Sequence, residues 1–166
     1  MEWNMVPYTD ADLPQMREIW NRVVEDGNAF PGDEPLSLEE CRSFFAAQSS
    51  TVCAKSGDKV AGLYILHPNN IGRCGHIANA SYGVSPAFRG KGIGEALVRH
   101  SIRLAGELGF RGLQFNAVVS TNHAAIALYK KLGFSEIGRI PGGYRQKNTG
   151  YVDTILYFIP TGTVTK

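Results

Sequence analysis

The residues from Arg89 to Gly94, which read Arg-Gly-Lys-Gly-Ile-Gly, have the composition of an anion-binding loop. They follow an apolar segment that ends near Val84 and lead into a stretch with helical spacing. Glycine lets the backbone approach a ligand closely and adopt conformations that a side chain forbids. The free N–H groups at a helix start carry the positive end of the helix dipole, and Arg89 and Lys91 add charge beside them. The loop therefore predicts a site for a phosphate or pyrophosphate group.

Two well-known phosphate loops do not match this segment. It lacks the G-x-x-x-x-G-K-[ST] pattern of P-loop proteins. A dinucleotide fingerprint, G-x-G-x-x-G, that started at Gly92 would need a glycine where Leu97 stands. Taken alone, a glycine-rich turn before a helix also fits an ordinary helix entrance, so the interpretation needs support from elsewhere in the chain.

A second segment, residues 122–134, reads Asn-His-Ala-Ala-Ile-Ala-Leu-Tyr-Lys-Lys-Leu-Gly-Phe. Taken alone, its Tyr129 fits the buried face of a helix. Together the two segments resemble the signatures of the GNAT N-acetyltransferases. Residues 89–94 are similar to the R/Q-x-x-G-x-G/A loop that binds acetyl-CoA, and residues 122–134 are similar to N-x-x-A-x-x-L-Y-x-K-L-G-F. The resemblance covers residues 60–158 well and the first fifty residues only by layout.

The resemblance implies an acetyltransferase that uses acetyl-CoA as cosubstrate and needs no metal. The loop would bind the pyrophosphate of CoA through backbone amides. The strand end 82–84 would pair with the pantetheine arm as an added strand does, and one of its amides would stabilise the oxyanion. Asn122 would contact the pantetheine arm, and Tyr129 would protonate the leaving thiolate. The implied acetyl-CoA-binding residues are Tyr82, Gly83, Val84, Arg89, Gly90, Lys91, Gly92, Ile93, Gly94 and Asn122.

The acceptor side is less well defined by the sequence. The predicted strand 75–84 has no Asp or Glu, although many family members carry a glutamate there, and His76 is an alternative base. Asn79 and Asn116 should lie in neighbouring strands, where asparagine is disfavoured and a buried amide needs partners. They either bracket the substrate beside the thioester, as catalytic candidates together with Tyr129, or cap a strand or satisfy a bulge.

The pattern H-I-x-N followed by F-N-x-V-x-x-T-N resembles a GNAT branch that acetylates proline analogues such as azetidine-2-carboxylate. In that branch the two asparagines hold the carboxylate and the nitrogen of the substrate. The resemblance therefore implies a primary or secondary amine of a small molecule as acceptor, such as an amino acid or a toxic analogue. Residues 30–35 and 140–145 are expected to wall the pocket, with Arg145 either paired with an acidic group or solvated.

Two other functions stay open. A protein or peptide amine as acceptor would require an open groove, whereas a small molecule would require a closed pocket. A non-catalytic sensor of acetyl-CoA would keep the phosphate loop but would not need Tyr129.

Composition sets broader limits. A chain of 166 residues suits one domain, residues 1–166, and a net charge of +2 without a Lys/Arg block argues against nucleic acid. No apolar run approaches the roughly 18 residues of a membrane span, and the N-terminus lacks the pattern of a signal peptide. Cys41, Cys53 and Cys74 fit neither a metal site nor a redox pair, so we expect reduced thiols in a cytoplasmic protein. A homodimer is an open expectation from the family.

Periodicity and chain breakers predict the order β-α-α-β-β-β-α-β-α-β-β. Ser37 and Glu40 should form a capping box at the second helix, and His67-Pro68-Asn69-Asn70 should end the third strand. The expected fold is the α/β (α+β) GNAT fold, a mixed and mostly antiparallel sheet of about seven strands flanked by about four helices, with a parallel crossover in the middle. The predicted helices cover about 11–26, 38–48, 92–108 and 123–132, and the strands 4–8, 51–55, 60–66, 75–84, 113–119, 135–140 and 151–159.

Overall fold

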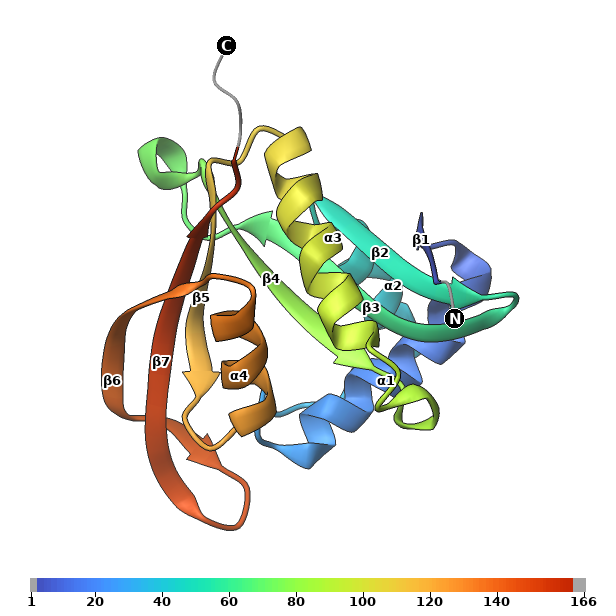
Figure 1. The fold of residues 1–166 in the computed structure, drawn as a ribbon. Coiled ribbons are helices and arrows are strands. Elements are labelled where there is room, and N and C mark those ends of the chain that lie inside the picture. The colour runs from blue at the N-terminus through green and yellow to red at the C-terminus, as the bar shows by residue number, and fades with distance from the viewer. Residues whose placement is uncertain (1–2, 163–166) are drawn as a thin grey trace.

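The computed structural model describes residues 3–162, which form a seven-stranded sheet with helices on both faces (Figure 1). The sheet order is β1-β2-β3-β4-β5-β7-β6, and all neighbours are antiparallel except β4 and β5. The predicted fold class is confirmed. The strands are β1 (Asn4–Pro7), β2 (Ser50–Ser56), β3 (Lys59–Pro68), β4 (Ile77–Val84), β5 (Gly112–Val119), β6 (Ser135–Gln146) and β7 (Gly150–Pro160), and the α-helices are α1 (Leu13–Asp26), α2 (Leu38–Ala46), α3 (Ile93–Glu107) and α4 (His123–Lys131).

Local sequence sets the helix ends. At the start of α2, the Glu40 N–H donates to Ser37 Oγ at 3.1 Å, and the Ser37 N–H donates to Glu40 Oε1 at 2.9 Å. This is the predicted capping box. At the end of α1, Gly27 has a φ of 65°, the left-handed conformation that glycine adopts without strain. The chain can therefore leave α1 sharply and enter the loop before α2.

Two strands end later than the sequence predicts. β3 continues through Pro68, which pairs with Ala78 at the last position of the strand, so it ends within the predicted stop segment but two residues past its predicted end at residue 66. A proline is tolerated there because it occupies the last pair of β3 with β4, so its missing N–H interrupts no further backbone hydrogen bonds of the strand. β6 continues to Gln146, past its predicted end at residue 140, because a register shift between Ile140 and Tyr144 absorbs the extra residues.

The two faces of the sheet carry different helices. α3 and α4 cover one face, and α1 and α2 cover the other (Figure 1). A β-carbon at Gly62 would lie 3.0 Å from Ile93 of α3, and a β-carbon at Gly83 would lie 3.0 Å from Ile19 of α1. Because both helices approach the strands so closely, the middle of the sheet is fixed from both sides.

β4 and β5 separate soon after they meet. Their parallel pairing is limited to Ile77 with Gly112 and Ala78 with Leu113. Further along, β5 carries a bulge between residues 115 and 118 and pairs with β7. A bulge bends its strand and increases the local twist, so a gap opens between β4 and β5 toward their carboxyl ends (Figure 1).

Within residues 3–162, no helix is long and apolar enough to cross a membrane. The same residues contain no group of three or more His, Cys, Asp or Glu side chains that could hold a metal ion. Cys41 and Cys53 are buried, Cys74 is exposed, and all three are free thiols.

Candidate active site

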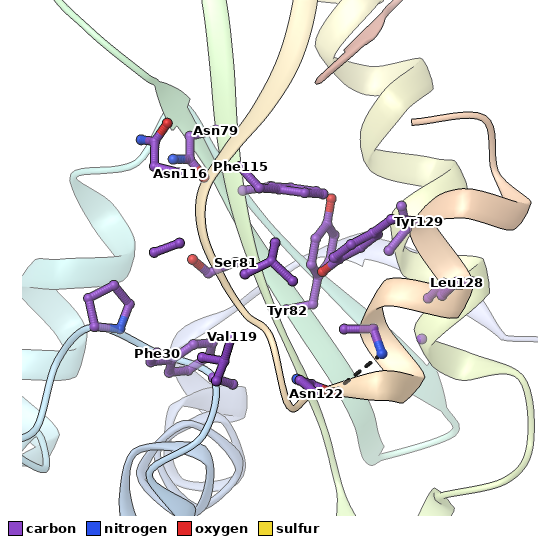
Figure 2. Close-up of a pocket in the computed structure, with 18 of the residues that line it drawn as sticks. Phe30, Asn79, Ser81, Tyr82, Phe115, Asn116, Val119, Asn122, Leu128 and Tyr129 are labelled. Carbon is purple, nitrogen blue, oxygen red and sulfur yellow. Dashed lines mark hydrogen bonds between the residues drawn. The ribbon is translucent and has the colours of Figure 1, made fainter. Parts of the chain in front are cut away.

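A cavity of about 420 Å³ occupies the gap between β4 and β5 (Figure 2). Its volume lies within the range of small-molecule pockets. Tyr129 and Leu128 of α4 lie on one side of β5, whereas Asn79, Asn116 and Phe30 lie on the other (Figure 2). The cavity therefore reaches from one face of the sheet to the other, and its two sides are built from different residues.

The end of β4 presents unpaired backbone groups to this gap. The His76 carbonyl accepts the Arg111 N–H at 2.8 Å, so the backbone groups of the even-numbered positions point toward β5. Tyr82 and Val84 lie beyond the last pair with β5, and their N–H and C=O groups therefore face the gap. Gly83 points its backbone groups toward β3 instead. Of the three strand-end residues predicted to pair with the pantetheine arm, two are placed to pair with an extended ligand.

The loop from Arg89 to Gly94 has an open backbone surface. Gly90 and Gly92 have φ values of 76° and 78°, which favour glycine. A β-carbon at either position would meet no atom within 4 Å, so the space beside the loop is empty of protein. α3 begins at Ile93, and the N–H groups of its first turn have no acceptor within the helix. An anion can therefore reach the backbone of this loop.

The two cations of the loop are held at the rim. Arg89 Nη2 lies 3.6 Å from the Asp26 carboxylate in a pair that is well exposed, and Lys91 Nζ lies 5.6 Å from the centre of the Phe88 ring. Exposed pairs of this kind contribute little free energy. Both cations therefore stay available to a phosphate group.

Tyr129 reaches into the cavity from α4 (Figure 2). Its ring centre lies 4.6 Å from that of Phe115, 5.4 Å from that of Phe134 and 5.9 Å from that of Tyr157. Burial raises the pKa of the Tyr129 hydroxyl, which therefore keeps its proton near neutral pH. No hydrogen bond within residues 3–162 involves that hydroxyl. The aromatic cluster therefore orients the ring, while the hydroxyl proton has no acceptor among the described residues and can be donated to a ligand.

The side chain of Tyr82, unlike that of Tyr129, makes a hydrogen bond within the protein. Its Oη lies 2.7 Å from Ser101 Oγ, and Ser101 donates to the Val98 carbonyl at 2.7 Å. Because a serine hydroxyl has one proton, Tyr82 must be the donor to Ser101. Burial also raises the pKa of Tyr82 well above its ordinary value. The phenol is thus committed to α3, and Tyr82 offers only its backbone to the gap.

Asn122 links the cavity to α4. Its Oδ1 accepts the Ala125 N–H at 3.3 Å and so caps the helix, while the residue also lines the cavity (Figure 2). The cap uses the carbonyl oxygen of the side chain. The Nδ2 group makes no hydrogen bond to the residues that the structure describes, so it is free to donate to a ligand.

Asn79 and Asn116 meet through a third asparagine that the sequence did not single out. Asn79 Nδ2 donates to Asn69 Oδ1 at 3.0 Å, and Asn116 Nδ2 donates to the same oxygen at 2.6 Å. Asn79 is half-buried, whereas Asn116 is exposed at the bulge of β5. Asn69 follows Pro68, and the sequence marks this segment only as a strand end.

The cavity lining lacks charged side chains. Among the described residues that line it, none is Asp, Glu, Lys or Arg, and the titratable groups are two tyrosines and His67. His76, the base considered from the sequence, does not line the cavity. His67 stands opposite Asn79 in the β3–β4 register and therefore shares its face. Its Nδ1 lies 2.9 Å from the Pro68 carbonyl, which can only accept, so in the neutral ring Nε2 keeps a lone pair.

The loop after α1 and the β6–β7 hairpin are joined beside the end of the cavity that Phe30 lines. Tyr144 Oη donates to the Phe30 carbonyl at 2.8 Å, and Arg145 Nη2 donates to Asp33 Oδ2 at 3.3 Å. Lys147 donates two more bonds, to the backbone carbonyl of Gly27 at 3.2 Å and to that of Glu25, in the last turn of α1, at 2.9 Å. We call these four contacts the clasp. Sequence reasoning had no means to find it, because its partners are more than 100 residues apart.

A second cavity of about 780 Å³ lies between the two segments that the clasp joins. It shares Phe30, Pro31 and Ala117 with the first cavity, so the two spaces meet there. Tyr144 and Arg145 line the second cavity, not the first. The Phe30 end of the first cavity therefore continues into a second space that the clasp bounds.

Comparison with known proteins agrees with this geometry. The model of the acetyltransferase (GNAT) family matches residues 13–134. N-acetyltransferase aca1 of Schizosaccharomyces pombe is 31% identical over 155 residues, which cover 82% of this chain and 74% of the relative. The structure of a GCN5-related N-acetyltransferase from Kribbella flavida has a TM-score of 0.88 at 36% identity, covering 95% and 97% of the two chains. A phosphinothricin acetyltransferase (Pat) from Sinorhizobium meliloti, solved in complex with AcCoA, has a TM-score of 0.89 at 27% identity, covering 100% and 93%.

Proposed function

The chain belongs to the GNAT family of acetyltransferases and is an acetyl-CoA-dependent N-acetyltransferase, and we propose that it acetylates a primary or secondary amine of a small molecule by direct attack in a ternary complex. The observation that carries the choice of acceptor is the clasp. It ties together the two segments that would have to stand apart to admit an extended peptide. A free amine can enter through the second cavity without opening these contacts.

In this proposal acetyl-CoA lies across the carboxyl end of β4. The open loop amides of residues 90–94 and the nearby cations bind the pyrophosphate. The pantetheine arm pairs with the backbone groups of Tyr82 and Val84, as an added strand would. The Asn122 Nδ2 group donates to the same arm. The splayed strands support this assignment because they leave these backbone groups unpaired next to an open cavity.

The transfer then needs no covalent intermediate on the protein. The lone pair of the amine attacks the thioester carbonyl, and the Tyr82 N–H donates to the oxygen as negative charge develops on it. When the C–S bond breaks, the electron pair goes to the sulfur, and the Tyr129 hydroxyl gives it a proton. A buried phenol that is protonated and free of other hydrogen bonds suits this step.

The attacking nitrogen must also lose a proton. We assign its removal to His67, directly or through one water, because Nε2 of this ring is left with a lone pair when Nδ1 donates to Pro68. The absence of a carboxylate from the described cavity lining supports this choice over an acidic base. His76, by contrast, is exposed and outside the cavity.

The test is the release of free CoA thiol from acetyl-CoA with a panel of acceptors. The panel should hold azetidine-2-carboxylate and other amino acids, polyamines, and peptides with free N-terminal and lysine amines. We expect release that depends on a small amine and little release with peptides. Preference for a peptide would contradict the proposed acceptor class. Tight binding of acetyl-CoA with no release for any amine would point to a sensor instead.

A further inference from the structure

We propose that Asn69 is a positioning residue, which holds Asn79 and Asn116 in the orientation that binds the acceptor amine. This inference rests on the proposed function, since it deepens the assignment of the acceptor side. Asn69 itself does not line the cavity. It acts through the two asparagines that do.

The position of Asn69 at the divergence of β4 and β5 is the first argument. The parallel ladder between these strands stops at Ala78, one residue before Asn79. From there on, no backbone ladder fixes the distance between β4 and β5. The Asn69 Oδ1 bonds to Asn79 and Asn116 bridge that interval, at 3.0 and 2.6 Å. Asn69 is itself anchored, because its N–H donates to the Ile77 carbonyl at 2.8 Å.

The direction of the hydrogen bonds is the second argument. Gln114 Nε2 donates to Asn116 Oδ1 at 2.9 Å, so the carbonyl oxygen of Asn116 is occupied and its Nδ2 faces Asn69. Asn69 then presents its oxygen, and that oxygen also accepts from Asn79. The Asn79 carbonyl oxygen is left without a hydrogen bond in residues 3–162. It is free to accept an N–H of the incoming amine while the lone pair of the amine turns to the thioester.

The position therefore requires an acceptor atom with two lone pairs, not an amide as such. An aspartate at 69 could accept from both asparagines, whereas a leucine of similar size could accept from neither. Asn70 provides a matched control. It is the exposed neighbour of Asn69, its side chain bonds only the N–H of Ile71, and it does not line the cavity.

The experiment compares the wild-type chain with Asn69→Leu, Asn69→Asp and Asn70→Leu by two readouts. One is the set of side-chain amide signals of Asn79 and Asn116 in ¹⁵N–¹H spectra, which needs no acceptor. The other is steady-state kinetics with azetidine-2-carboxylate and acetyl-CoA varied separately. We expect Asn69→Leu to shift both amide signals, speed their proton exchange, and raise the acceptor KM about tenfold with the acetyl-CoA KM unchanged. Asn69→Asp should restore both readouts, and Asn70→Leu should change neither.

The outcomes separate the two levels of the argument. Unchanged amide signals in Asn69→Leu would overturn the positioning role even if the enzyme acetylates small amines. Shifted signals with an unchanged acceptor KM would leave Asn69 as a structural residue and also overturn the proposal. If azetidine-2-carboxylate and every other small amine fail as acceptors with the wild type, the proposed function fails first, and the role of Asn69 toward an acceptor falls with it.

Discussion

The two sides of the cavity are built in opposite ways. The side that we propose for acetyl-CoA offers backbone groups from the end of β4 and from the loop of residues 89–94, with Tyr129 added from α4. The side that we propose for the acceptor offers side chains, which are held by hydrogen bonds among asparagines and by the clasp. A site made of backbone groups depends little on side-chain identity beyond its glycines, so it suits a ligand that stays the same when side chains are substituted. A site made of side chains can change its ligand by substitution, so specificity should reside there.

The largest effect should come from Tyr129→Phe, because this change removes the hydroxyl proposed to protonate the leaving sulfur without removing a group that binds acetyl-CoA. We expect kcat to fall at least about 100-fold, while the Kd for acetyl-CoA measured by calorimetry stays unchanged. The matched control is Tyr157→Phe. Tyr157 packs against Tyr129, but its buried hydroxyl has no partner among the described residues and lies outside the cavity.

Removing that unsatisfied hydroxyl should leave kcat unchanged and should not lower the Tm. Equal losses of kcat in the two variants would assign Tyr129 to aromatic packing alone.

The next effect should come from Gly92→Asp, which tests whether the loop backbone binds the pyrophosphate. A side chain at its φ of 78° is strained by about 1–2 kcal/mol, and a carboxylate there would repel the phosphates. We expect the Kd for acetyl-CoA to rise about 30-fold in calorimetry. Gly57→Asp is the control, since Gly57 has a φ of 59° and open space beside it but lies in the β2–β3 turn. The assignment is wrong if both variants bind acetyl-CoA like the wild type.

Asn116→Ala should have a smaller effect, confined to the acceptor side. It removes one of the two bonds to Asn69, and we expect the acceptor KM to rise about tenfold while the acetyl-CoA KM stays constant. In the double variant with Asn69→Leu, the acceptor KM should rise by less than the product of the two single increases, because both changes break the same hydrogen bond. A loss of Tm with normal kinetics would instead make Asn116 a residue that only stabilises the bulge.

The smallest effect should come from Arg145→Ala, which opens one contact of the clasp. The side chains of Arg145 and Asp33 are 70% and 74% exposed, so their pair contributes little free energy. We expect the acceptor KM to change by less than about threefold in steady-state kinetics. A rise of tenfold or more that depends on salt would show that Arg145 binds an acidic group of the acceptor and would place part of the recognition in the second cavity.

The same contrast explains what could be predicted from the sequence. The phosphate loop and Tyr129 lie in two short segments, where glycine conformations and helix spacing are local properties, so their elements and positions could be read directly. His67 could not, because it joins the site through the register of β3 with β4, and Asn69 could not, because it joins through hydrogen bonds to residues 10 and 47 positions away. The sequence offered His76 only as an alternative base, because a histidine titrates near neutral pH. The histidine that lines the cavity is His67, which lies opposite Asn79 on the neighbouring strand β3.

The β6–β7 hairpin shows the same limit on a larger scale. The predicted strand ended at residue 140, yet the structure keeps Pro141 and the two glycines in β6, within the register shift between Ile140 and Tyr144. Only this extension carries Tyr144 and Lys147 to the loop after α1. The clasp therefore depends on pairing between strands and on contacts between distant segments, neither of which leaves a local pattern.

The most direct test of this account is a crystal structure of the protein with acetyl-CoA. We expect the pyrophosphate on the backbone N–H groups of residues 90–94 and the pantetheine arm in the gap beside Tyr82 and Val84. The thioester sulfur should lie within hydrogen-bond reach of the Tyr129 hydroxyl, at about 3.5 Å. A pyrophosphate bound elsewhere, or a sulfur far from Tyr129 with the gap empty, would contradict the division of the cavity into an acetyl-CoA side and an acceptor side.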